Sequence, residues 1–174
     1  MGYFIGVPAG STPYDDLIES PFSPIPAQRR HLTIVYIGDD PRCVMAKDVI
    51  KSLIEYRPFS LKYVGIDFLP SKAKPRYMVA VLERSPRLLR IRTHLMMLLE
   101  EKGIAPHDRY ENYIPHISIA ELRVKYSLEL YRRMKRVLKL ASERRGCFIV
   151  NKLVLYEARG QTLRPLAEAC LSSR

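Results

Sequence analysis

The chain has 174 residues, of which 47% are hydrophobic and 27% are charged, a composition typical of a soluble globular protein. No run approaches the ~20 apolar residues of a membrane span, and the start of the chain lacks the basic and apolar segments of a signal peptide. The formal net charge of +11 favours a polyanionic partner, most commonly nucleic acid. We therefore expect a cytoplasmic protein with no membrane partner.

The first half of the chain alternates strand and helix patterns. A Pro- and Ser-rich stretch at 11–28 predicts a loop with one helical turn near 14–18. Helical spacing with Pro at the start predicts a helix at 41–56, and a Ser-Pro start with a Gly stop predicts another at 85–103. Apolar runs predict strands at 3–7, 31–37, 59–70 and 75–84.

The second half repeats the order of the first. It predicts a strand that carries His116, a helix at 127–146 that Ser127 caps, and a strand at 147–160. Each half thus runs from a strand with a His-x-Ser/Thr motif to a helix and then a strand. We expect an α+β fold, a single domain over 1–174 with two pseudo-symmetric lobes. Their mostly antiparallel sheets would be small, flanked by helices, and arranged around a central cleft.

Three cysteines, Cys43, Cys147 and Cys170, are far apart and have no metal-ligand spacing. The chain also has no Gly-rich phosphate loop of the Walker type. We expect reduced cysteines, no metal site and no cofactor.

The two motifs are the strongest chemical signal. His31 and Thr33 lie two residues apart on one predicted strand, as do His116 and Ser118 on another, so each pair shares one face of its strand. Two imidazoles near neutral pH can serve as one general base and one general acid. Two hydroxyls can bind the non-bridging oxygens of a phosphodiester. The alternative is that each histidine is structural and bonds a backbone carbonyl.

Simple alternation also predicts the residues that follow the second motif. Ala120 would share the face of His116 and leave room for a ligand, whereas Glu121 would point to the opposite face unless a bulge intervened. Arg30, directly before His31, would meet phosphates, and Tyr36 would stack on bases.

The stretches "HLTIVYIG" and "PHISIAEL", with the opening "YFIGVP", resemble the 2H phosphoesterase superfamily and its RNA 2′,3′-cyclic phosphodiesterase branch, the 2′-5′ RNA ligase family. The resemblance implies a metal-independent enzyme that hydrolyses RNA 2′,3′-cyclic phosphate ends, including those of tRNA fragments, to 2′-phosphates. It implies that His116 activates water and that His31 protonates the leaving 3′ oxygen.

Family members usually carry an arginine five residues after the second histidine, where this chain has Glu121. Arg123 would take over that contact with the substrate. We expect the protein to be a monomer. Two other functions stay open: another 2H-type activity such as 2′-5′ RNA ligation or cyclic nucleotide opening, and a non-catalytic basic RNA-binding module.

Overall fold

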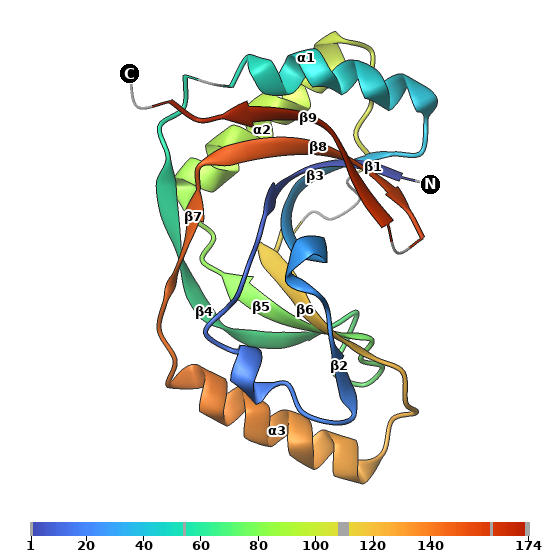
Figure 1. Ribbon diagram of the computed structural model, residues 1–174, viewed down its shortest axis with the longest axis vertical. Coiled ribbons are helices and arrows are strands. Elements are labelled where there is room, and N and C mark those ends of the chain that lie inside the picture. The colour runs from blue at the N-terminus through green and yellow to red at the C-terminus, as the bar shows by residue number, and fades with distance from the viewer. Residues whose placement is uncertain (1, 54, 108–111, 161, 173–174) are drawn as a thin grey trace.

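The computed structural model describes residues 2–53, 55–107, 112–160 and 162–172. Within these ranges, nine strands form one curled antiparallel sheet, and the α-helices lie at its two ends (Figure 1). The sheet order is β7-β4-β5-β6-β3-β1-β8-β9, with β2 paired to β6. The α+β class and the antiparallel pairing are therefore confirmed.

One half of the sheet contains the first histidine motif. It consists of β1 (Gly2–Pro8), β3 (His31–Gly38), β8 (Lys152–Arg159) and β9 (Thr162–Cys170). We call it the first half-sheet. The other half carries the second motif and is called the second half-sheet. It consists of β2 (Phe22–Pro24), β4 (Phe59–Leu69), β5 (Tyr77–Leu82), β6 (His116–Leu122) and β7 (Cys147–Val150).

The half-sheets meet where Leu32 of β3 pairs with Ile117 of β6. The expectation of two separate sheets is therefore wrong, because this antiparallel pairing joins the two motif strands into one sheet. The junction lies between the two histidine motifs, so the fold brings residues 85 positions apart in the chain side by side.

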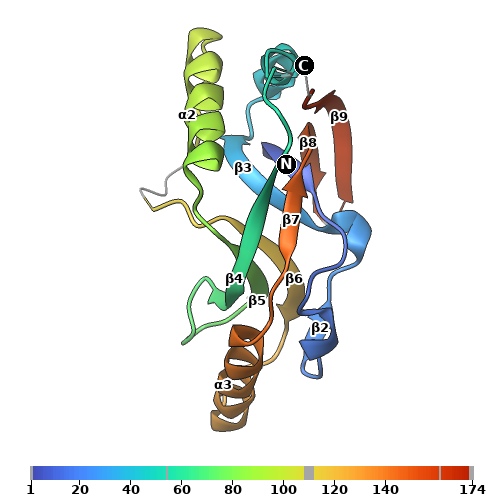
Figure 2. The ribbon, with the colours of Figure 1, turned by 90° about the vertical axis from the view of Figure 1, so that its left-hand side faces the viewer.

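The α-helices cover the two ends of the molecule. Helix α1 (Ala46–Lys51) packs on β8 and β9, α2 (Pro86–Glu101) packs on β3, and α3 (Leu128–Ser142) packs on β4 at the far end (Figure 2). Short 3-10 helices precede or connect the strands: η1 (Asp15–Leu17), η2 (Ala27–Arg29) and η3 (Pro41–Met45). In the described part of the chain, none of the helices is both long and apolar enough to span a bilayer.

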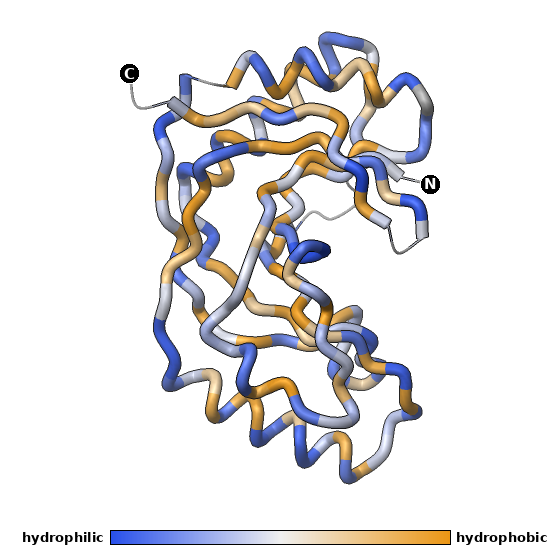
Figure 3. Tube along the Cα trace, in the orientation of Figure 1, coloured by the Kyte–Doolittle hydropathy of each residue, from blue (hydrophilic) through white to orange (hydrophobic). Residues whose placement is uncertain are grey.

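The sequence explains where the two long helices start. The Ser85 hydroxyl accepts a hydrogen bond from the Leu88 amide, and the Ser127 hydroxyl accepts one from the Leu130 amide. In α3, hydrophobic and hydrophilic residues alternate with the helical period (Figure 3), which buries an apolar stripe against the sheet. That stripe consists of Leu130, Met134, Val137 and Ala141.

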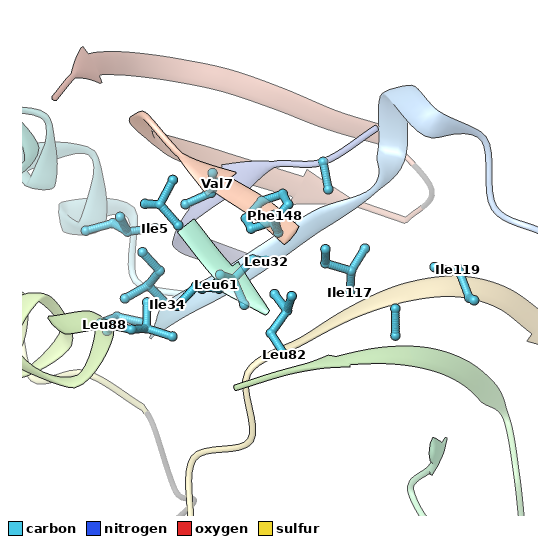
Figure 4. Packing of buried hydrophobic residues seen from close by; sticks show 14 of the residues in the cluster. Ile5, Val7, Leu32, Ile34, Leu61, Leu82, Leu88, Ile117, Ile119 and Phe148 are labelled. Carbon is cyan, nitrogen blue, oxygen red and sulfur yellow. The ribbon is translucent and has the colours of Figure 1, made fainter. Parts of the chain in front are cut away.

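One continuous hydrophobic core fills one side of the curled sheet and extends through both half-sheets. Figure 4 shows β1 and β3 side chains packed against those of β4, β5, β6 and α2 in this core. Among them are Ile5, Leu32, Leu82, Leu88 and Ile117. The polar residues of the two motifs lie on the other side of the sheet, so the core fixes which face they present.

Two predicted elements differ from the structure, and two strands were not predicted. The predicted helix at 41–56 is a 3-10 turn, η3, followed by the short α1. The single strand predicted at 147–160 is two strands, because the chain crosses at Asn151 from the second half-sheet to the first. Strands β2 and β9 were not predicted; β2 and η2 lie in or at the end of the stretch at 11–28 that was predicted as a loop with one helical turn.

Candidate active site

The register at the junction brings the two motifs together. Because Leu32 pairs with Ile117 in an antiparallel ladder, His31 lies beside Ser118, and Thr33 lies beside His116. Leu32 and Ile117 are fully buried in the core, whereas these four polar residues are half-buried on the opposite face. We call that side of the sheet the histidine face. The two histidines occupy one diagonal of the group of four, and the two hydroxyls occupy the other.

Both histidines are oriented by the same local hydrogen bond. The Nδ1 atom of His31 lies 3.0 Å from the Arg29 carbonyl oxygen, and the Nδ1 atom of His116 lies 2.8 Å from the Ile114 carbonyl oxygen. A carbonyl oxygen can only accept, so each Nδ1 carries the hydrogen and donates it. In both neutral rings the lone pair is therefore on Nε2. Neither Nε2 has a hydrogen-bond partner among the described residues.

The surroundings favour the neutral form of both rings. Burial lowers the pKa of His31, the hydrogen bond to the Arg29 carbonyl opposes that shift, and the charges of His116 and Arg29 lower the pKa further. Burial also lowers the pKa of His116, against the opposing effect of the Ile114 carbonyl. The charge of His116 thus acts on the His31 ring, as expected for groups that face one site.

A β-bulge in β3 places Tyr36 on the histidine face. Strand β1 pairs its Gly6 with Thr33 and its Ile5 with Val35, so Ile34 is the extra residue of the bulge. The alternation of side chains shifts by one position after it. Tyr36 therefore lies opposite Phe4 and shares the face of His31 and Thr33, where it is exposed. Its hydroxyl donates to Asp39 Oδ1 at 2.7 Å.

A second bulge, at the equivalent position of β6, overturns two expectations. Val79 pairs with Ser118 and Met78 pairs with Ala120, so Ile119 is the extra residue. Ala120 consequently turns into the core, where it is fully buried, and leaves no room for a ligand. Glu121 turns onto the histidine face and not away from it. Glu121 and Tyr36 each lie five residues after a motif histidine.

An aromatic cluster backs His31. The Phe4 ring stacks on the His31 ring with centroids 4.5 Å apart, and Tyr156 stacks on Phe4 at 5.0 Å. Gly6, next to Phe4 on this face, allows β1 to approach closely, because a Cβ there would lie 2.6 Å from the Leu32 carbonyl oxygen. The sequence reasoning missed Phe4 and Tyr156, although the opening "YFIGVP" contains the first of them.

The Arg30 side chain forms its hydrogen bonds with other groups of the protein. Its guanidinium donates to both carboxylate oxygens of Asp15 at 2.7 Å and to the Ile25 carbonyl at 2.8 Å, and its side chain is buried. Because these bonds occupy its guanidinium, we do not include Arg30 among the phosphate-binding residues of the proposed site. These bonds instead hold the loop between β1 and β3 in place.

Arg29 and Arg123 flank Glu121 beside the four motif residues. Arg123 Nη2 donates to Glu121 Oε2 at 2.9 Å, and Arg29 Nη2 lies 3.9 Å from Glu121 Oε1. The structure thus brings together Arg123, which the sequence analysis named, and Arg29, which it did not name. The only signal for Arg29 is that it precedes Arg30 and His31 in the sequence.

The remaining histidines and the cysteines lie elsewhere. His94 of α2 is hydrogen-bonded through Nδ1 to the Tyr56 hydroxyl at 3.0 Å, and the His107 ring packs beside Gly38. Cys43 is buried, and Cys147 and Cys170 are exposed; all three are free thiols.

Comparison with known proteins gives matches to one family. Residues 18–162 match the 2′-5′ RNA ligase superfamily. The chain is 31% identical over 101 residues to a protein named RNA 2′,3′-cyclic phosphodiesterase from Aquifex aeolicus strain VF5. That alignment includes 55% of this chain and spans about half (53%) of the relative.

Solved structures share the fold over almost the whole chain. The protein TT0787 of Thermus thermophilus superposes with a TM-score of 0.68 at 19% identity, and the match covers 98% of both chains. LigT of E. coli, solved in complex with 3′-AMP, superposes with a TM-score of 0.62 at 15% identity and covers 99% of this chain and 98% of that one.

Proposed function

The chain belongs to the 2′-5′ RNA ligase superfamily, and from this membership we propose that it is a metal-independent phosphodiesterase that hydrolyses 2′,3′-cyclic phosphate ends of RNA. The product is an RNA that ends in a 2′-phosphate. The name of the Aquifex aeolicus relative supports this choice of substrate. The observation that carries the proposal is the diagonal arrangement of two histidines and two hydroxyls at the Leu32–Ile117 junction.

The diagonal arrangement suits an in-line displacement at phosphorus. Diagonal neighbours in an antiparallel pair lie about 7–8 Å apart, which leaves room for a phosphate group between the two Nε2 atoms. One imidazole then faces the attacking water and the other faces the departing oxygen. The hydroxyls of Thr33 and Ser118, on the other diagonal, donate to the non-bridging oxygens and stabilise the charge that builds up there.

In the proposed step, His116 Nε2 takes a proton from water while the water oxygen bonds to phosphorus. The bond from phosphorus to the 3′ oxygen breaks, and His31, protonated at Nε2, gives its proton to that oxygen. The phosphate stays on the 2′ oxygen. The two half-sheets act as two pseudo-symmetric lobes, each supplying one histidine and one hydroxyl. Tyr36 provides an aromatic surface for the terminal base.

The direct test is a hydrolysis assay with a short RNA that ends in a 2′,3′-cyclic phosphate, with EDTA present. We expect the mass to increase by one water and the product to resist a 3′-specific phosphatase. His31→Ala and His116→Ala should each lower kcat by about 10²–10⁴-fold, because each removes one proton transfer.

RNA binding should survive in both variants. His94→Gln serves as the matched control and should keep wild-type activity, because His94 is bonded to Tyr56 away from the two motifs. Binding without turnover in the wild type would favour the non-catalytic RNA-binding module, and loss of activity with EDTA would contradict metal independence.

A further inference from the structure

A polar pocket lies next to the four motif residues and is not used by the proposed hydrolysis step. It has a volume of about 310 Å³ and is lined by three arginines, Arg29, Arg76 and Arg123, together with Glu121 and Tyr77. Leu122 and Gly160 complete the lining. Gly160 lies in the turn between β8 and β9, so residues of both half-sheets contribute. The bulge at Ile119 creates this pocket in part, because it turns Glu121 onto the histidine face.

The charges in the pocket do not cancel. Among the described lining residues Glu121 is the single carboxylate, and it contacts Arg123 at 2.9 Å and Arg29 at 3.9 Å. Arg76 is exposed and has no acidic partner among the described residues. Three guanidinium groups against one carboxylate leave an excess of positive charge, which favours an anion. Guanidinium groups match the oxygens of a phosphate in charge and in geometry.

Arg29 connects the pocket to the histidines. Its carbonyl oxygen holds Nδ1 of His31, and its side chain lines the pocket. Its Nε atom is buried and has no hydrogen-bond partner among the described residues. Because Nε is shielded from the pocket, an anion bound there would meet the Nη groups of Arg29, of which Nη2 lies 3.9 Å from Glu121 Oε1.

The position of the pocket relative to the motifs suggests which phosphate it takes. Arg29 is two residues before His31, and Glu121 is three residues after Ser118, so the pocket adjoins the His31–Ser118 side of the motif residues. An RNA that ends in a 2′,3′-cyclic phosphate continues only in the 5′ direction. The next anionic group along it is the phosphodiester of the preceding nucleotide.

We propose that Arg29, Arg76 and Arg123 bind this phosphodiester, one nucleotide upstream of the cyclic phosphate. This inference rests on the proposed function, because it assumes that the reacting group lies between the two histidines. Glu121 holds Arg123 in position and limits the excess charge. The enzyme then selects RNA chains over mononucleotides by their second phosphate, with no need to read the base.

The test compares three substrates. These are adenosine 2′,3′-cyclic phosphate, the adenosine dinucleotide with the same cyclic end, and that dinucleotide with a neutral methylphosphonate in place of its internal phosphodiester. We expect kcat/KM for the charged dinucleotide to exceed that for the other two by about tenfold, from its charge-assisted hydrogen bonds.

Two exposed arginines provide the variants. Arg76→Gln and Arg123→Gln should each lower kcat/KM for the charged dinucleotide by about tenfold, mainly through KM, because a charge-assisted bond is lost. In Arg76→Gln, hydrolysis of the cyclic mononucleotide should stay within about twofold of wild type, since this substrate lacks the second phosphate. Arg90→Gln, an exposed change on α2 outside the pocket, is the matched control.

Equal kcat/KM for the charged and neutral dinucleotides would overturn the inference. The inference would also be overturned if the variants lowered kcat/KM for the cyclic mononucleotide as much as for the charged dinucleotide. If the wild type hydrolyses none of the substrates, the proposed function fails, and calorimetry of dinucleotide binding tests the pocket separately. Weaker binding of the methylphosphonate, and of the charged dinucleotide to Arg76→Gln, would then support the pocket, whereas equal binding would refute it.

Discussion

The backbone next to His31 and His116 sets the orientation of each imidazole ring. Each ring donates its Nδ1 hydrogen to the carbonyl two residues earlier, which leaves the lone pair of each neutral ring on Nε2. The His-x-Thr/Ser spacing was enough to predict the four residues and their common face. It could not predict the ring orientation, or that Arg29 and not Arg30 borders the site, because both depend on the turn before β3.

The lowered pKa values of the two histidines predict the pH dependence of the reaction. Acid–base catalysis needs one protonated and one neutral imidazole, and both folded pKa values lie below the ordinary value of ~6.5. As pH rises through these values the required proton is lost, and as pH falls both rings become charged. We therefore expect a bell-shaped kcat/KM profile with its maximum below about pH 6.5.

Steady-state kinetics on the cyclic substrate at constant ionic strength would measure this profile. The kcat profile should lie at higher pH than the kcat/KM profile, because a bound phosphate stabilises the imidazolium form. A kcat/KM maximum on the alkaline side of neutrality would contradict the assignment of the two histidines as the acid–base pair.

At the scale of the elements, two matching bulges decide which residues reach the histidine face. Each motif strand has an extra residue three positions after its histidine, Ile34 in β3 and Ile119 in β6. Strict alternation failed for Ala120 and Glu121 because a bulge depends on the pairing with a neighbouring strand. Strand β9 was missed for a related reason: most of its residues are exposed or polar, and β8 defines it by pairing.

The segment between β1 and β3, which Arg30 holds in place, provides a prediction about stability. Arg30→Met should lower the free energy of unfolding by about 2–3 kcal/mol, because it removes a buried guanidinium and leaves Asp15 and two carbonyls without their donor; the figure is reduced because Asp15 is partly exposed. Urea denaturation would measure this.

Arg42→Met removes the exposed Arg42–Asp40 pair and is the matched control, with an expected loss of less than about 1 kcal/mol. A rise in KM for RNA in Arg30→Met without any loss of stability would instead assign Arg30 to the substrate.

At the scale of the whole molecule, the placement of the two histidines depends on one contact between half-sheets. Each half-sheet is well paired internally, but β3 and β6 pair only at Leu32 and Ile117 within the described residues. The internal repeat in the sequence predicted two related units. It could not predict that they join edge to edge, because that requires knowing which strands are left at the edges.

Leu32→Ala should therefore affect stability and activity together. Loss of a buried leucine costs about 2–5 kcal/mol, and a small displacement of one histidine relative to the other should lower kcat by about tenfold or more. Leu155→Ala, equally buried on β8 and away from the junction, is the matched control, with a similar loss of stability.

Both variants should be assayed at a temperature where they are fully folded, with kcat as the readout. An equal kcat in Leu32→Ala and Leu155→Ala would contradict a special role for the junction.

The identical bonding of the two histidines has a consequence for the direction of the reaction. By microscopic reversibility, the ring that accepts a proton in one direction donates it in the other. Since the same carbonyl bond presents each Nε2, the orientation of the rings alone gives no preference for breaking or making the phosphodiester in the proposed reaction. In the proposed reaction, a water molecule in the place of the incoming group gives hydrolysis, and a ribose hydroxyl there gives ligation. The balance between these two outcomes then depends on which nucleophile occupies the space beside His116, and not on the two histidines.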